Sequence, residues 1–218
     1  GGLQLGEDLT VTGDSQLVLY GALDAALPTL SAALVLLDGT DVVLAGQGYV
    51  DAGTTTGQNG ATVAPGYSPG TLQFSGDVDF SNGGEADMEI AGTTPGTEHD
   101  QIIIGGRLTL GGTSVLNIET IDGYVPVQGD AYQLLRFDPE LRTGMFSTIT
   151  NTSDSNFVYV NTTGVLTSLG SSLGDADEQL LTMVSETDHG RHDEIASVVE
   201  QLADGGDTGN GVIAAGGG

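Results

Sequence analysis

Apolar residues in this chain recur as short pairs separated by one residue, and each pair ends at a glycine or a polar turn. Three groups of such pairs are Leu3/Leu5, Leu9/Val11 and Leu17/Leu19; Leu72/Phe74, Val78/Phe80 and Met88/Ile90; and Ile102/Ile104, Leu108/Leu110 and Leu116/Ile118. A pair of this kind places two side chains on one face of a β-strand and the residue between them on the other face. The pattern therefore predicts many short strands, each with one apolar face.

A spacing of thirty residues relates some of these pairs. It aligns Val42, Leu72, Ile102 and Tyr132, and in the same way Leu44, Phe74, Ile104 and Leu134. Three short strands joined by glycine turns form a coil that cannot bury its apolar face alone, whereas stacked coils can. The spacing predicts an all-β chain folded as a parallel β-helix, or β-solenoid. A β-sandwich is the alternative, because it also uses short strands and Gly-rich turns.

The pattern changes after residue 170. Residues 1–170 are predicted to form the β-helix domain, residues 171–206 short C-terminal helical segments, and residues 207–218 a Gly-rich tail. The helical prediction rests on one apolar stripe with the spacing of a helix face, formed by Ile195, Val198, Val199 and Leu202.

Composition narrows the possible partners. The 218 residues carry a net charge of −26, with four arginines, no lysine and no cysteine. A chain this acidic repels nucleic acid and anionic membranes and attracts cations, and it forms no disulfides. Because no stretch approaches about 20 consecutive apolar residues, we expect no transmembrane helix.

Three motifs occur in order in the middle of the chain: Pro65-Gly66-Tyr67-Ser68-Pro69-Gly70-Thr71-Leu72, His99-Asp100-Gln101-Ile102 and Leu110-Gly111-Gly112-Thr113. Over about residues 60–137, this series resembles the strand repeats of bacterial autotransporter passenger domains and related surface proteins with autotransporter-associated β-strand repeats. The resemblance implies a right-handed β-helix that is extracellular, on the bacterial cell surface, and serves as an adhesin, a spacer or a structural element.

The first motif also matches the G-x-S-x-G pattern of serine hydrolases at Ser68. In those enzymes the nucleophile begins a helix, and the N–H of the next residue lines the oxyanion hole. Here the next residue is Pro69, which has no N–H, and an alternating strand pattern follows. Ser68 is therefore predicted to be a turn residue.

Acidic residues are the candidate metal ligands. Asp77 and Asp79, and likewise Asp87 and Glu89, alternate with apolar residues and so share one outward face of a strand. Stacked coils could align these carboxylates and attract calcium, while a solvated acidic face is the alternative. A second candidate, His189 with His192, lacks the further ligands that zinc requires, and a connector between helices is the alternative interpretation.

These features together lead to an expectation about the function. We expect a structural or adhesive surface protein and no enzymatic activity. The alternative is a β-helix that binds or cleaves polysaccharides, although four arginines supply little to hold an acidic sugar. Partners are expected to be further copies of the chain, other surface components or glycans. An uncapped solenoid exposes unpaired strand edges, which would favour head-to-tail filaments promoted by salt or calcium. A monomeric spacer, capped by the C-terminal helical segments, is the alternative.

Overall fold

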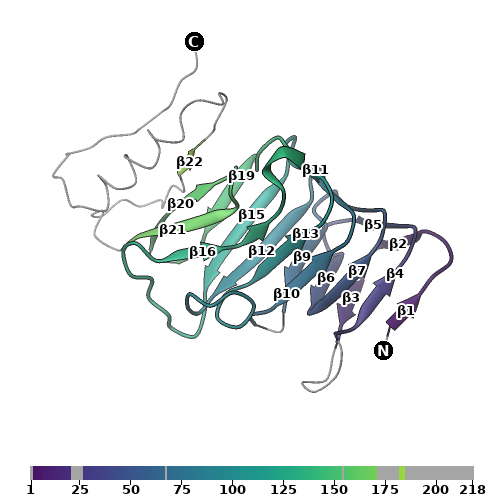
Figure 1. Cartoon of the computed structure of the whole chain (residues 1–218), viewed down its shortest axis with the longest axis horizontal. Helices are drawn as coiled ribbons and strands as arrows, with labels where there is room; N and C mark the ends of the chain where they lie inside the picture. Colours follow the sequence, from purple (N-terminus) through teal and green to yellow (C-terminus); the bar gives the residue numbers. More distant parts are fainter. Residues whose placement is uncertain (1, 21–26, 67, 154, 171–181, 185–218) are drawn as a thin grey trace, which may run out of the picture.

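A computed structural model describes residues 2–20, 27–66, 68–153, 155–170 and 182–184 of the chain. Short strands follow one another around a common axis and stack into three parallel sheets, which we name A, B and C (Figure 1). The prediction of an all-β chain with a parallel β-helix is therefore confirmed.

Each of the three sheets has six strands. Sheet A contains β1 (Gly2–Gln4), β4 (Thr29–Ser31), β7 (Gly48–Asp51), β10 (Thr71–Phe74), β13 (Gln101–Ile104) and β17 (Leu135–Arg136). Sheet B contains β2 (Leu9–Thr12), β5 (Leu34–Asp38), β8 (Thr54–Gln58), β11 (Asp77–Asn82), β14 (Leu108–Thr109) and β18 (Arg142–Thr143). Sheet C contains β3 (Gln16–Leu19), β6 (Val43–Gly46), β9 (Thr62–Pro65), β12 (Glu85–Ile90), β15 (Val115–Thr120) and β19 (Thr148–Asn151). One coil consists of one strand from each sheet, taken in that order.

The predicted thirty-residue spacing holds for one step of the stack. Leu72 lies beside Ile102, as expected. Toward the N-terminus, however, Leu72 lies beside Gly48, which is 24 residues earlier, and the step before that, from Leu30 to Val50, is 20 residues. Toward the C-terminus, Ile102 lies beside Leu135, which is 33 residues later. The coils are therefore unequal in length.

The spacing therefore misplaced four of the aligned positions, Val42, Leu44, Tyr132 and Leu134, of which Val42 and Leu134 lie just before a strand. Leu44 belongs to β6 of sheet C, although its predicted counterpart Phe74 lies in sheet A. Tyr132 belongs to a strand outside the three sheets. Both residues are nevertheless buried, because alternation determines which side chains face inward, while the connections between strands determine the coil length.

The inward side chains form one hydrophobic core along the axis. All of the predicted interior residues are buried: Leu72, Phe74, Val78, Phe80, Met88, Ile90, Ile102, Ile104, Leu108, Leu110, Leu116 and Ile118. The residues predicted to face outward are half-buried or exposed: Gln73, Asp77, Asp79, Arg107 and Thr109. The predicted register of inward and outward positions is confirmed for these strands.

A fourth sheet, sheet D, covers the C-terminal end of the stack. Its strands are β16 (Ala131–Gln133), β21 (Val165–Gly170), β20 (Asn156–Val160) and β22 (Thr182–Val184), and β21 pairs antiparallel with both β16 and β20. Tyr132, Phe157 and Tyr159 from this sheet join the common core. The Tyr132 and Phe157 rings meet edge to face with centroids 6.2 Å apart. This end of the core is thereby shielded from solvent.

One short 3-10 helix, η1 (Pro139–Leu141), follows Asp138, whose side chain accepts a hydrogen bond from the backbone N–H of Glu140. Within the segment 171–206 that was predicted to be helical, residues 182–184 form β22, which pairs parallel with β20. The rest of that segment and the Gly-rich tail lie outside the described residues.

Candidate functional site

The connections between strands differ in length at one corner of the stack. Between sheets A and B, and between sheets B and C, neighbouring strands are two to five residues apart. From sheet C back to sheet A, the connections comprise residues 20–28, 47, 66–70, 91–100 and 121–134, and the last of these includes β16. We call this corner, at the lower side of Figure 1, the loop edge. In solenoid proteins, insertions of this kind gather on the face that often binds.

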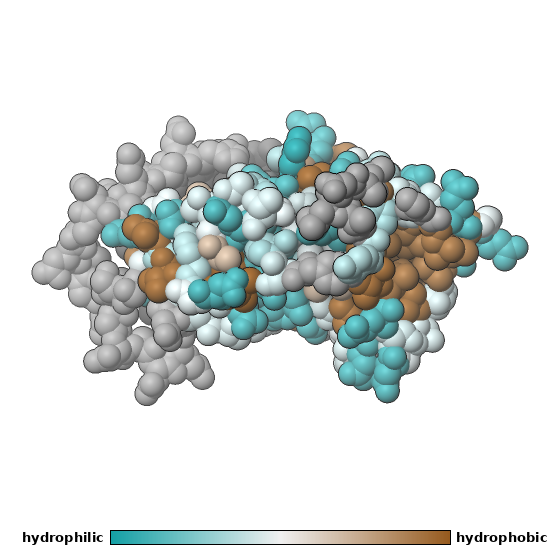
Figure 2. Space-filling model, turned by 90° about the horizontal axis from the view of Figure 1, so that it is seen from below, coloured by the Kyte–Doolittle hydropathy of each residue, from teal (hydrophilic) through white to brown (hydrophobic). Residues whose placement is uncertain are grey.

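Exposed apolar side chains also gather at the loop edge. Four of the seven large apolar side chains that are exposed among the described residues lie here: Tyr20, Leu27, Val125 and Val127. Val125 and Val127 are 68% and 66% exposed, whereas Pro126 between them is buried. Figure 2 looks at this edge from below and shows apolar surface toward both ends of the molecule. Single exposed apolar side chains are normal on a protein surface, whereas a contiguous group of them marks a contact site.

Asp100 fixes the loop of residues 91–100. Its Oδ1 accepts a hydrogen bond from the backbone N–H of Gly70 at 2.7 Å, and its Oδ2 accepts one from that of Glu89 at 2.9 Å. The side chain is 1% exposed. Burial raises the pKa of Asp100 to about 7, although the two N–H donors act in the opposite direction. Asp100 thus joins its loop to β12 and to the turn that precedes β10, both in the fourth coil.

His99 belongs to the same loop, and its side chain packs beneath it. Its Nδ1 lies 3.1 Å from the carbonyl oxygen of Gly92, and its ring meets the Tyr132 ring edge to face, with centroids 5.5 Å apart. Its Nε2 is buried and has no hydrogen-bond partner among the described residues. Burial lowers the pKa of His99, so the ring is neutral at pH 7 and serves to pack the loop against sheet D.

Asp130 organises the neighbouring loop of residues 121–130. Its Oδ2 accepts hydrogen bonds from the backbone N–H of Val127 and the hydroxyl of Tyr124, both at 2.9 Å, and from the hydroxyl of Tyr132 at 3.3 Å. The backbone N–H of Ser168 in β21 donates to the carbonyl oxygen of Asp130 at 2.8 Å. The exposed valines are therefore presented by a loop that already has a fixed conformation.

The G-x-S-x-G motif has a structural explanation. Ser68 is exposed in a bend with φ of 91°, and β10 follows it, so the prediction of a turn is confirmed. Gly66 and Gly70 lie against each other so closely that a Cβ on Gly70 would overlap the Cα of Gly66. Because the N–H of Gly70 donates to Asp100, the first two of the three motifs that carry the autotransporter resemblance meet in space.

The predicted metal ligands lie on two different sheets. Asp77 and Asp79 are in β11 of sheet B, and Asp87 and Glu89 are in β12 of sheet C. Protein donors already contact three of these side chains: Asp77 accepts from the N–H of Arg107 at 2.7 Å, Asp79 from Ser81, and Asp87 from Asn117. The fold therefore does not bring the four together. Calcium binding stays a prediction, which calorimetric titration with calcium and then magnesium would test.

Other candidate ligands gave no site in the part of the chain that is described. There, no three His, Cys, Asp or Glu side chains lie close enough to hold a metal ion, and His189 and His192 fall outside it. Nor do the described residues contain a helix with the length and apolar character of a membrane span.

Comparison with protein families, with curated proteins and with solved structures gave no match. The loops of residues 91–100 and 121–130, together with the exposed apolar side chains of the loop edge, are therefore the basis for a functional assignment. Sequence reasoning missed these loops, because an exposed valine beside a proline has no recognisable pattern.

Proposed function

We propose that the protein is a structural or adhesive element of a bacterial cell surface, and that its loop edge is the contact surface. The observation that carries this proposal is the clustering at one corner of both the long connections and most of the exposed apolar side chains. A rigid stack that displays loops along one side suits contact with a large partner better than it suits enclosure of a small substrate.

Two further features support the proposal. Asp100 and Asp130 fix the loops before any partner arrives, so that little conformational entropy is lost on binding. The autotransporter resemblance, of whose three motifs two meet at Gly70 and Asp100, supports an extracellular location. Association between copies and contact with glycans or other surface components belong to the same proposal.

The test uses beads that carry the full chain. They are allowed to settle on octyl-coated glass, on films of neutral and acidic polysaccharide, and on a layer of the same beads, and detachment under flow is measured. The variant Val125→Ser/Val127→Ser should detach several times faster from the surface that holds the wild type. The matched variant Val18→Ser/Leu34→Ser removes exposed apolar groups elsewhere and should detach like the wild type. Equal retention of all three proteins would refute the loop edge as the contact surface.

The same films separate adhesion from catalysis. New reducing or unsaturated ends in the polysaccharide would show that the protein cleaves it, and their loss on substitution of one carboxylate would replace the structural proposal with an enzymatic one. Location is tested separately, because an antibody against the chain should label intact cells of the source bacterium.

A further inference from the structure

Among the described residues, five buried side-chain polar atoms have no hydrogen-bond partner, and four of the five lie in one region. These four are Nε of Arg142, the hydroxyl of Tyr159, Nδ2 of Asn161 and Oγ1 of Thr162. The fifth is Nε2 of His99, in the loop of residues 91–100. Nearly all buried polar atoms in proteins are hydrogen-bonded, so a group of exceptions in one place requires an explanation, such as a bound ion.

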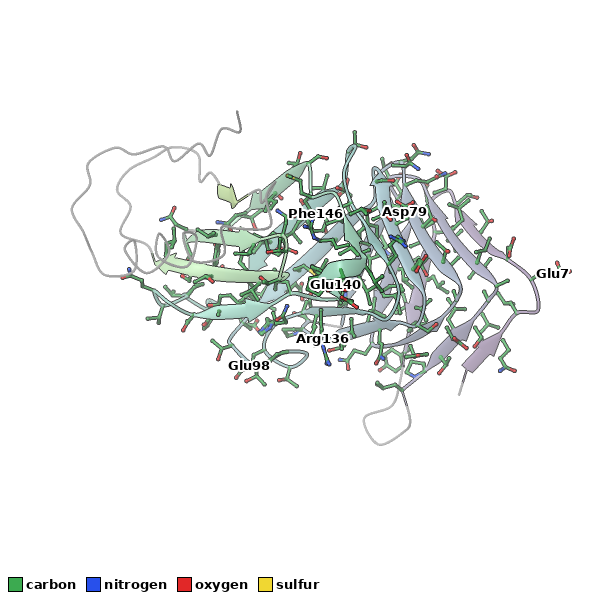
Figure 3. The ribbon with its side chains drawn as sticks, turned by 45° about the horizontal axis from the view of Figure 1, so that its top comes forward. Glu7, Asp79, Glu98, Arg136, Glu140 and Phe146 are labelled. Atoms are coloured by element: carbon green, nitrogen blue, oxygen red, sulfur yellow. The ribbon has the colours of Figure 1, made fainter. Side chains whose placement is uncertain are left out.

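Phe146 connects these side chains. Its ring meets the Tyr159 ring edge to face, with centroids 6.0 Å apart, and its backbone N–H donates to Oδ1 of Asn161 at 3.2 Å. Nη1 of Arg142 donates to the carbonyl oxygen of Gly144, and the charge of Arg142 acts on the hydroxyl of Tyr159. In Figure 3, Phe146 lies toward the end of the stack that sheet D covers. The group therefore stands where β18 of sheet B meets β20 of sheet D and the turn after it.

All four atoms can donate a hydrogen bond. Nε of Arg142 and Nδ2 of Asn161 carry N–H groups and cannot accept one. Burial raises the pKa of Tyr159 well above its usual value, although the charge of Arg142 acts in the opposite direction, so the hydroxyl keeps its proton at pH 7. The contact of Arg142 with the carbonyl of Gly144, a neutral group, leaves its positive charge unbalanced. The group therefore combines several donors with one positive charge.

We propose that Arg142, Tyr159, Asn161 and Thr162 bind one small anion of the size of chloride. A halide accepts hydrogen bonds and donates none, and the charge of Arg142 favours it over water. Tyr159 and Asn161 are only 0% and 3% exposed, which favours a single-atom ion over a sulfate or a sugar carboxylate. Arg142 and Thr162 are half-buried, so the ion enters from their side.

A bound anion would have a structural consequence. It would join β18, the last strand of sheet B, to the turn that follows β20, and so hold sheet D against the end of the stack. Because the ion binds the folded chain alone, its concentration would raise the stability of the fold. This inference does not depend on the proposed function.

Thermal melting of the full chain in two sodium salts tests the proposal. The same sodium concentration, about 0.2 M, keeps the general screening of the acidic chain constant. With chloride as the anion, the melting temperature should be about 2–4 °C higher than with gluconate, which is too large to enter the site. Hydrogen exchange at the backbone N–H groups of residues 146 and 157–160 should also be several-fold slower in chloride.

Three variants locate the effect. Asn161→Asp keeps the acceptor for the N–H of Phe146 and replaces Nδ2 with a carboxylate oxygen, so the chain supplies the negative charge itself and chloride should add nothing. Tyr159→Phe removes one donor and should reduce the difference between the two salts to about half or less. The matched control is Arg107→Met, which removes an exposed arginine outside the group and should keep the full difference.

Two results would overturn the inference. Equal melting of the wild type in chloride and gluconate would show that a neutral partner, such as water, satisfies these donors. A chloride effect that persists at full size in both Asn161→Asp and Tyr159→Phe would show that the anion binds elsewhere on the chain.

Discussion

Asp100 is a carboxylate that the fold holds away from water while both of its oxygens accept backbone N–H groups. Two further acids, Glu89 and Asp87, lie near enough to oppose its ionisation. Burial is the largest of these effects, and it raises the pKa from 3.8 to about 7. The ionised form is thus disfavoured in the folded protein relative to the unfolded chain.

This shift predicts an unusual dependence of stability on pH. Because the folded state holds the proton of Asp100 up to about pH 7 and the unfolded state releases it near pH 4, the free energy of unfolding should rise as the pH falls through that window. The slope from this group is roughly 1.4 kcal/mol per pH unit. Urea unfolding at several pH values measures it, and Asp100→Asn should flatten the curve. A wild-type free energy of unfolding that decreases steadily as the pH is lowered from 7 to 5 would contradict the raised pKa of Asp100.

Sequence reasoning identified Asp100 only as part of a motif. A buried acid between Glu98 and Gln101 resembles any other acid in so acidic a chain, and nothing local predicts that its partners are Gly70 and Glu89. The turn at Ser68 was predictable, in contrast, because the absence of an N–H at Pro69 follows from covalent structure alone.

Alternation within a strand is the feature that the sequence predicted best. It depends only on the two-residue period of the β-strand, and the burial of every predicted interior residue confirms it. Pairing between strands was harder to predict, because β20 and β21 are short and rich in apolar residues, like the strands of the coils, but join through a tight antiparallel turn. Local pattern does not distinguish these two kinds of pairing.

Ile104 tests the inward register of β13. Ile104→Asp places an unpartnered carboxylate in the core and should lower the free energy of unfolding by about 3–5 kcal/mol. The matched variant is Ile103→Asp, since Ile103 is half-buried on the opposite face and lies beside Arg136 of β17. Urea unfolding at pH 8 should show a loss below about 1 kcal/mol for this control. Equal losses for both variants would contradict the register.

The loop of residues 121–130 makes a separate prediction about Asp130. Asp130→Ala removes the acceptor of the Val127 N–H and leaves the hydroxyls of Tyr124 and Tyr132 only each other, at 3.1 Å; this should cost about 1–3 kcal/mol. Chymotrypsin should then cleave next to Tyr124 about tenfold faster. Asp130→Asn keeps one acceptor oxygen and should be intermediate. Unchanged cleavage in Asp130→Ala would show that the loop is held by other contacts.

At the scale of the whole molecule, charge opposes the fold. Thirty acids against four arginines repel one another across the stack, and this repulsion extends over about 30 Å at 0.01 M salt but only about 3 Å at 1 M. The melting temperature should therefore rise by several degrees between these salt concentrations, as calorimetry would show. A melting temperature that does not change with salt would mean that the outward acids are already balanced by local partners.

The unequal lengths of the coils are the feature of the whole molecule that could not be predicted from the sequence. A regular spacing of thirty residues was correct from Leu72 to Ile102 and wrong on either side, because the connections at the loop edge range from one residue to fourteen. The length of a loop depends on what the loop contacts. The apolar pairs within the strands therefore do not predict it.

Engineered disulfides test the stacking most directly, because the chain has no cysteine of its own. The outward positions Tyr49 and Gln73 are neighbours in the structure, and so are Gln73 and Ile103. Both cysteine pairs should oxidise readily and join their strands, as mass spectrometry after proteolysis would show. The pair Val43→Cys/Gln73→Cys, which a uniform thirty-residue coil would bring together, should stay reduced. A disulfide between residues 43 and 73, with none between 49 and 73, would contradict the unequal coils.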